Sequence, residues 1–191
     1  MMWKDWNQFS PAGNECDHLV ELQLIKAALE SIGFCQAWTG MLHLAASEGH
    51  VTISAAELTA IFAILKTAAN DNRGMHYLAK SVNGEKEHFV AQIIQKRGPV
   101  HMHLPVNSHV VSYVQTLKSV GDTIAANVDH AAVATLKALY TKATSEHKAG
   151  TSQEDKDVYA CALMDEMEKA TGFEEKITAV SKYWGYLRAS S

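Results

Sequence analysis

The chain has 191 residues, of which 47% are hydrophobic and 20% charged, and a formal net charge of −4. These values are typical of a folded globular protein and exclude a disordered chain, and the length suits one sizeable domain. Acidic and basic residues are spread evenly over both halves, so the strong positive charge of a general nucleic-acid binder is missing and nucleic acid is not an expected partner, although the even spread leaves room for a local basic patch.

Residues 1–14 are expected to form an arm ahead of the helical domain. Trp3, Trp6 and Phe9 recur every third residue, so a short helix would present the three rings on one side. These rings either dock on the protein's own core or form a partner-binding or self-associating surface, because aromatic rings are favoured interface anchors.

Apolar residues at helical spacing predict helices through the first half of the chain. The first is expected from about Glu15 to Ile32, with Asn14 as its N-cap and Gly33 as its stop. A second is expected over residues 34–50, although Thr39-Gly40 weakens the pattern.

A capping box, Ser54-Ala-Ala-Glu57, opens the third expected helix. The apolar positions of that helix are Leu58, Ile61, Phe62 and Leu65. After an interruption at residues 70–72, the pattern predicts a short helix over 75–82, a turn at Asn83-Gly84 and a further helix from Glu85 to Lys96.

The segment from Arg97 to His109 interrupts the helices near the middle of the chain. Pro99 and Pro105 lack a backbone N–H and favour an extended preceding residue, so a helix cannot continue here. We expect a single helical domain over residues 15–191, with sub-halves 15–97 and 107–191 hinged at this break.

Four helices are expected after the break. The first begins at Asn107 or Ser108, and the second opens at Asp129. Thr151 or Ser152 caps the third, which Gly172 ends, and the fourth bears an apolar stripe of Ile177, Val180, Trp184 and Leu187. The expected fold is therefore all-α, a compact bundle of seven to eight antiparallel helices whose two halves join at the Pro/His-rich break.

The three cysteines, Cys16, Cys35 and Cys161, are widely spaced and form no CxxC pair. Neither a disulfide framework nor a thiolate zinc site is predicted. The first residues lack the apolar run of a secretory signal, and no uncharged apolar stretch approaches the ~20 residues that span a bilayer. We therefore expect a cytoplasmic protein with no membrane partner.

Two histidines in the central break are the candidate metal ligands. In an extended segment His101 and His103 point to the same side, and His109 follows at the start of the next helix. Such a set could bind zinc or iron, or place one imidazole on a haem iron. The spacing favours a structural or solvent-facing role instead, because ten histidines make chance His-x-His pairs common.

The last expected helix concentrates aromatic residues. Trp184 fits its buried stripe, and Tyr183 and Tyr186 flank the tryptophan. With Arg188, the two tyrosines form either the edge of the core or a partner-binding surface.

No nucleophile motif or phosphate-binding glycine loop is present, so no catalytic or cofactor-binding residue is predicted and a non-enzymatic role is favoured. We expect a small soluble protein that binds a protein partner as an inhibitor, adaptor or regulatory subunit, with a homodimer as one form. The first alternative is a metal or haem protein, enzyme or sensor, centred on His101 and His103. The second is DNA binding through a helix-turn-helix-like segment at residues 54–82.

Overall fold

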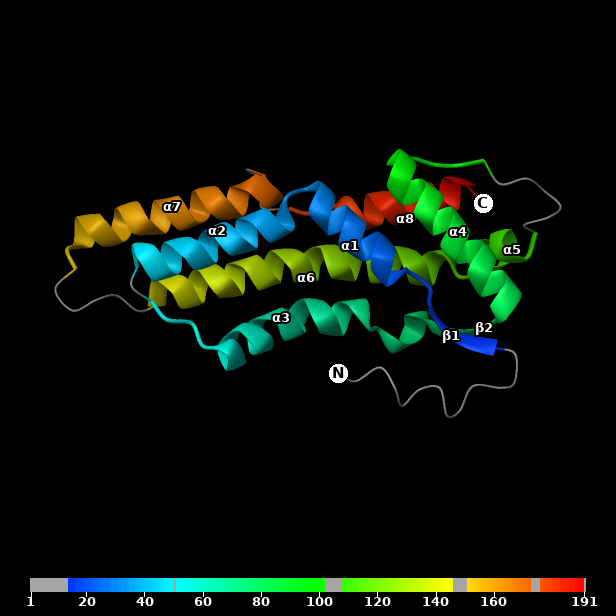
Figure 1. Cartoon of the computed structure of the whole chain (residues 1–191), viewed down its shortest axis with the longest axis horizontal. Helices are drawn as coiled ribbons and strands as arrows, with labels where there is room; N and C mark the ends of the chain where they lie inside the picture. Colours follow the sequence, from blue (N-terminus) through cyan, green and yellow to red (C-terminus); the bar gives the residue numbers. More distant parts are fainter. Residues whose placement is uncertain (1–13, 50, 102–107, 146–150, 173–175, 191) are drawn as a thin grey trace. The chain divides into compact units, whose positions relative to one another are not determined.

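The computed structural model describes residues 14–49, 51–101, 108–145, 151–172 and 176–190. Within these ranges the chain forms eight α-helices, one 3₁₀ helix and a two-stranded ribbon (Figure 1). The prediction of a mostly helical protein is confirmed, and the ribbon is an addition to it. The elements are β1 (Asn14–His18), α1 (Leu22–Ser31), α2 (Phe34–Ser47), α3 (Ala55–Ala69), η2 (Asn72–Gly74), β2 (Met75–Ala79), α4 (Lys80–Lys96), α5 (Ser108–Thr116), α6 (Lys118–Ser145), α7 (Gln153–Thr171) and α8 (Ala179–Ser190).

The described residues divide into two compact units. Unit 1 takes its residues from the segments 1–28, 69–127 and 180–191, and unit 2 from 29–68 and 128–179. Each unit therefore combines segments from both sides of the central break. Helix α6 contributes to both, with residues 118–127 in unit 1 and 128–145 in unit 2.

Unit 2 is built on the packing of α2 against α7, which lie side by side in Figure 1. Two glycines allow this close approach. A Cβ at Gly40 would overlap the carboxylate of Glu166, and one at Gly49 would overlap the ring of Tyr159. The hydroxyl of Tyr159 then donates to the carbonyl oxygen of Ala143 in α6, 3.1 Å away. Gly40 thus serves helix packing inside α2.

Unit 1 contains a corresponding close contact between α8 and the start of α6. Trp184 is buried, and its ring fills the space that a side chain at Gly121 would occupy. The Trp184 indole N–H donates to Asp122 Oδ1 at 2.9 Å, and Arg188 Nε lies 3.1 Å from the same oxygen. These contacts fix the indole against α6.

Several helix ends lie where local signals predict them. The Ser54 amide donates to Glu57 Oε2 at 2.8 Å and the Glu57 amide donates to Ser54 Oγ at 3.3 Å, which confirms the capping box. Ser152 Oγ accepts from the amide of residue 155 at 3.1 Å, and Gly172 ends α7 with a left-handed φ of 65°. The stripe predicted for the last helix is buried, namely Ile177, Val180, Trp184 and Leu187. In α7 the buried apolar residues are Tyr159, Leu163, Met167 and Ala170.

Two segments expected to be helical are strands. Residues 14–18 form β1, which pairs antiparallel with residues 75–79 of β2, so that Asn14 lies opposite Ala79 and His18 opposite Met75. The first helix accordingly begins only at Leu22. Pairing with a partner far along the chain satisfies the backbone groups of both segments, and local periodicity contains no information about such a partner.

Three expected helix boundaries are also wrong. Helix α4 runs through the expected turn at Asn83-Gly84, and α6 runs through the expected start at Asp129. Helix α5 ends at Thr116, so the helix predicted as continuous from residue 108 is divided there. Asp129 is 2% exposed and lies among buried apolar residues. Burial of a continuous stripe outweighs the modest preference of Asn, Gly and Asp for helix ends.

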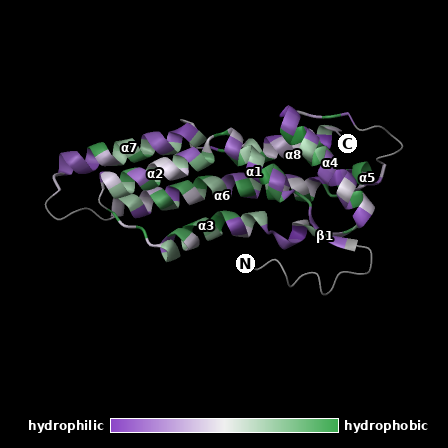
Figure 2. Ribbon diagram, viewed as in Figure 1, coloured by the Kyte–Doolittle hydropathy of each residue, from purple (hydrophilic) through white to green (hydrophobic). Residues whose placement is uncertain are grey.

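Polar and apolar residues alternate around most of the helices, as Figure 2 shows for α6 and α7. None of the described helices has the length and hydropathy needed to cross a membrane.

Candidate functional site

Helix α3 is apolar around most of its circumference and yet largely exposed. Its only charged residues are Glu57 and Lys66, and its only buried residue is Leu65. Leu58 and Ile61 lie on the same side as Leu65 and are half-buried. That side faces the interior of unit 2, so the opposite side of α3 is an outward apolar face.

The centre of this outward face is made of small side chains with larger ones at its edges. Helical geometry places Ala56, Ala60 and Ala63 along the centre, and all three are exposed. Phe62 and Ile64 lie on opposite edges, with 47% and 38% of their surface exposed.

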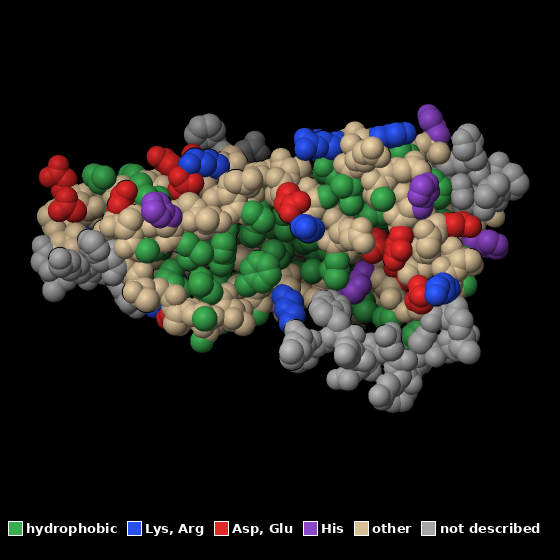
Figure 3. All heavy atoms as spheres, in the orientation of Figure 1, with side chains coloured by type: hydrophobic (Ala, Val, Ile, Leu, Met, Phe, Trp, Pro, Cys, Tyr) green, Lys and Arg blue, Asp and Glu red, His purple; other side chains and the backbone are tan. Residues whose placement is uncertain are grey.

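Helix α2 extends the apolar area beyond Phe62. The ring of Trp38 meets the ring of Phe62 edge to face, with their centroids 6.1 Å apart. Leu42 follows Trp38 one helical turn later, and both residues are half-buried. Figure 3 shows hydrophobic side chains gathered over α2 and α3. We call these six exposed or half-buried positions the α3 surface: Trp38, Ala56, Ala60, Phe62, Ala63 and Ile64.

The acidic residue of α3 is held away from this surface. Glu57 Oε1 lies 2.9 Å from Lys142 Nζ on α6, and Ser54 binds the other carboxylate oxygen. Hydrogen bonds from Lys142 and then Ser54 lower the pKa of Glu57 to about 2. Its charge is therefore paired with α6, and no acidic side chain belongs to the α3 surface.

Unit 1 contains a different kind of site, a lysine with no exposed surface. Lys86 of α4 places its Nζ 2.7 Å from Asp17 Oδ2 and 2.9 Å from Glu21 Oε1. The ammonium group also donates to the carbonyl oxygen of His18. These contacts join α4 to β1 and to the residue that precedes α1.

Tyr113 of α5 completes this cluster. Its ring centroid lies 5.6 Å from Lys86 Nζ, and its hydroxyl donates to Asp17 Oδ2 at 3.1 Å. Burial, together with the negative charge of Asp17, raises the pKa of Tyr113 far above its ordinary value, so the phenol keeps its proton. We call Asp17, Glu21, Lys86 and Tyr113 the Lys86 cluster.

The Lys86 cluster is absent from the sequence-based predictions. Lys86 stands in a polar run, but it lies three residues before Phe89 and seven before Ile93, which is the spacing of one helix face. Both apolar residues are buried. A lysine at the helical spacing of two apolar residues was therefore the sequence signal that could have indicated a buried charge.

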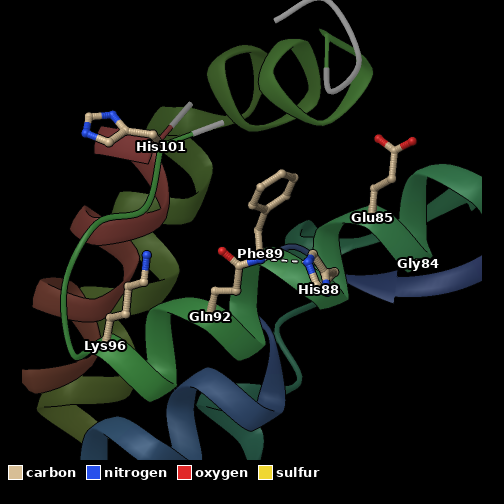
Figure 4. Close-up of a pocket in the computed structure, with 7 residues that line it drawn as sticks. All are labelled: Gly84, Glu85, His88, Phe89, Gln92, Lys96 and His101. Carbon is tan, nitrogen blue, oxygen red and sulfur yellow. Dashed lines mark hydrogen bonds between the residues drawn. The ribbon is translucent and has the colours of Figure 1, made fainter. Parts of the chain in front are cut away.

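An open pocket of about 620 Å³ lies along α4 and the segment that follows it (Figure 4). Gln92 Nε2 and His88 Nε2 lie 2.6 Å apart in its lining. Figure 4 shows Glu85 and His101 pointing away from this pair. The polar groups do not converge on one point, so the pocket indicates no ligand class.

The candidate metal ligands are only partly described. His101 and His109 are exposed, and His103 lies outside the described residues. Among the residues that the structure describes, no group of three or more His, Cys, Asp or Glu side chains could hold a metal ion.

The candidate partner-binding residues also differ in placement. Trp3, Trp6 and Phe9 lie outside the described residues. Tyr183 is 5% exposed and Tyr186 is half-buried, with their ring centroids 5.6 Å apart. Arg188 is paired with Asp122, so this group packs within unit 1.

The segment 54–82 does not form two successive helices. Helix α3 is followed by η2 and then by strand β2, so the expected recognition helix over residues 75–82 is not formed. This corrects the structural basis of the helix-turn-helix hypothesis.

No protein-family model, curated protein or solved structure matches this chain.

Proposed function

We propose that this protein binds a protein partner through the α3 surface, and that the bound element is an apolar helix of that partner. The observation that supports the proposal is that a helix of fifteen residues buries only Leu65. Contiguous apolar surface left exposed on a folded protein marks an interaction site. The protein would act as an adaptor, inhibitor or regulatory subunit.

The shape of the α3 surface favours a helix as the bound element. Alanines along the centre allow a partner backbone to approach closely, and Phe62 and Ile64 form ridges on either side. Helices pack by placing the ridges of one into the grooves of the other, and helix-in-groove binding uses apolar anchors spaced three and four residues apart.

The charges favour a protein over an anionic membrane. Lys66 is the only basic residue of α3, and the whole chain carries a net charge of −4. Membrane-surface helices instead combine their apolar face with several lysines or arginines.

The proposal is tested by photo-crosslinking from the α3 surface. A photoreactive residue at Ala63 should trap one partner in cells of the source organism, whereas the same residue at Val158 of α7 should not. Val158 is a matched control because it is apolar and 64% exposed but lies outside the α3 surface. Equal trapping at both positions would contradict the proposal.

The trapped partner is then purified and titrated against wild type and a Phe62→Ser, Ile64→Ser double variant. Loss of two anchors should weaken the Kd at least tenfold. Equal affinity would overturn the proposal. Sedimentation of the chain alone tests whether the partner is a second copy of the same chain. If the wild type is a dimer and the double variant is a monomer, the α3 surface binds another copy of this chain and not a foreign protein.

A further inference from the structure

We propose that the Lys86 cluster is a proton-operated switch, in which a proton on Glu21 strengthens the attachment of β1 and the start of α1 to α4 and α5. This inference concerns unit 1 and is independent of the α3 surface. It rests on the charge balance of the cluster, on its hydrogen bonds and on its burial.

The cluster contains more negative than positive groups. Asp17 and Glu21 offer two carboxylates to the single ammonium of Lys86. The side chains of Lys86, Asp17 and Glu21 are 0%, 2% and 14% exposed, so water contributes little solvation. A second ionised carboxylate leaves one uncompensated charge in a buried site, which is costly.

The contacts around the two carboxylates favour Glu21 over Asp17 as the group that takes the proton. Lys86 donates to Asp17 Oδ2, and Tyr113 donates to the same oxygen. Glu21 Oε1 is buried 2.9 Å from the same ammonium, which it shares with Asp17, and no second donor contacts it. Protonated Glu21 can instead share a hydrogen bond with Asp17. Glu21 is therefore the weakly satisfied anion of the pair.

The pKa of Glu21 agrees with this assignment. Burial is the largest cause that raises it, Lys86 lowers it in part, the charge of Asp17 raises it, and the net value is about 7. A glutamate with this pKa changes charge close to neutral pH, where ordinary carboxylates are already fully ionised.

The other titratable groups around Glu21 come from four elements. Tyr113 on α5 keeps its proton, and burial raises the pKa of Cys16 on β1, so its thiol stays neutral. Lys86 on α4 and Asp17 on β1 form the ion pair. His76 on β2 meets the ring of Tyr113 edge to face, with centroids 6.0 Å apart, and its Nε2 is buried without a hydrogen bond. A readout at the carboxyl group itself therefore separates Glu21 from this neighbouring imidazole.

The direction of the pH effect follows from linkage. The folded pKa of about 7 exceeds the ordinary value of 4.5, so between these values the folded protein holds a proton that the unfolded chain releases. The Glu21 contribution therefore favours unfolding as pH rises from 4.5 to 7, by up to tenfold per pH unit in the unfolding equilibrium, and is constant above that range.

The direct test is a carboxyl titration of the full chain labelled with ¹³C at the glutamate side-chain carboxyl. One resonance should titrate with a midpoint near pH 7 and should vanish in Glu21→Gln. In Glu87→Gln, which removes an exposed glutamate next to Lys86, it should remain. If every glutamate resonance of the wild type titrates below pH 5, the proposal is overturned without reference to any variant.

The structural consequence is tested by amide hydrogen exchange, corrected for the intrinsic effect of pH. The Leu19 amide donates to the Gly74 carbonyl at 2.7 Å, next to the cluster, and reports on β1. Its protection should fall at least tenfold between pH 5.5 and 7.5 in the wild type and stay level in Glu21→Gln. The Val51 amide, bound to the Ala45 carbonyl in unit 2, is the internal reference. An equal fall at Leu19 in both proteins would contradict the switch.

Discussion

Lys86 is the residue whose replacement should affect stability most. Lys86→Met keeps the length of the side chain but leaves Asp17 and Glu21 buried without their cation. Removing one partner of a buried ion pair typically costs about 3–5 kcal/mol, because the remaining charge is uncompensated. Urea unfolding at pH 7.5 should show a loss of this size.

An exposed lysine on the same helix provides the control. Lys80 lies 3.9 Å from Glu15, and its side chain is 80% exposed. Lys80→Met should change the free energy of unfolding by no more than about 0.5 kcal/mol. Similar losses in the two variants would show that the buried position has no special role.

Gly121 is a second residue whose replacement should affect stability, in the direction opposite to the general helix preference for alanine over glycine. In an exposed helix, Gly→Ala stabilises by up to about 1 kcal/mol. At Gly121 the added Cβ would overlap the ring of Trp184, so the tight contact between α6 and α8 must open. We expect Gly121→Ala to lower the free energy of unfolding by roughly 1–3 kcal/mol, the usual cost of overpacking, as measured by urea unfolding.

Gly185→Ala is the control that separates the effect of crowding from the effect of helix propensity. Gly185 also lies within a helix, but a Cβ there would meet only Arg188 Nη2, at 3.9 Å. Gly185→Ala should be neutral or stabilising. A loss of stability in this variant as large as that in Gly121→Ala would argue against the crowding explanation.

Residue-scale prediction from sequence succeeds at positions whose role is local. Trp184, at the centre of a predicted stripe, is 1% exposed. Lys86 and Glu21 lie far apart in sequence, and only folding brings them together. Burial decides the pKa of Glu21, and a pattern along the chain contains no measure of that burial.

At the scale of elements, the capping box of α3 offers a direct test. Ser54→Ala removes the acceptor of the Glu57 amide and one of the two groups that hold the Glu57 carboxylate. Loss of such a cap costs about 1 kcal/mol, and the first turn of α3 should fray. Urea unfolding measures the energy, and amide exchange at Leu58 locates the fraying.

Thr59 serves as the reference for that change. It is exposed in the interior of α3 and donates to the Ala55 carbonyl at 2.7 Å. Thr59→Ala improves helix propensity slightly and should leave the stability within about 0.5 kcal/mol. Equal losses from Ser54→Ala and Thr59→Ala would show that the cap contributes nothing specific.

Helices were predictable where the chain signals their ends locally, and strands were not. Ser152 and Gly172 bound α7 as their residue types indicate. Strand β1 has the sequence Asn-Glu-Cys-Asp-His, which shows no apolar alternation, and its partner β2 begins at residue 75. A two-stranded ribbon whose strands pair at long range leaves no periodic pattern in either segment.

At the scale of the whole molecule, the arrangement into two units could not be predicted. The central break predicts a single domain with sub-halves 15–97 and 107–191, and the two units of the structure each take segments from both sides of this break. The reason is that unit membership depends on which apolar stripes face each other. Stripes of similar composition, such as those of α7 and α8, give no indication of their partners in the sequence.

The discontinuous make-up of unit 1 has a consequence for biosynthesis. Its interior includes Trp184 and Leu187 of α8, which pack with segments made much earlier, such as Gly121. A ribosome synthesises a chain from its N-terminal side, so unit 2, whose segments end at residue 179, is available for folding first. Until α8 emerges, the part of α6 around Gly121 lacks the ring of Trp184 that packs on it. A nascent chain that still lacks α8 therefore leaves this part of unit 1 open to non-native contacts.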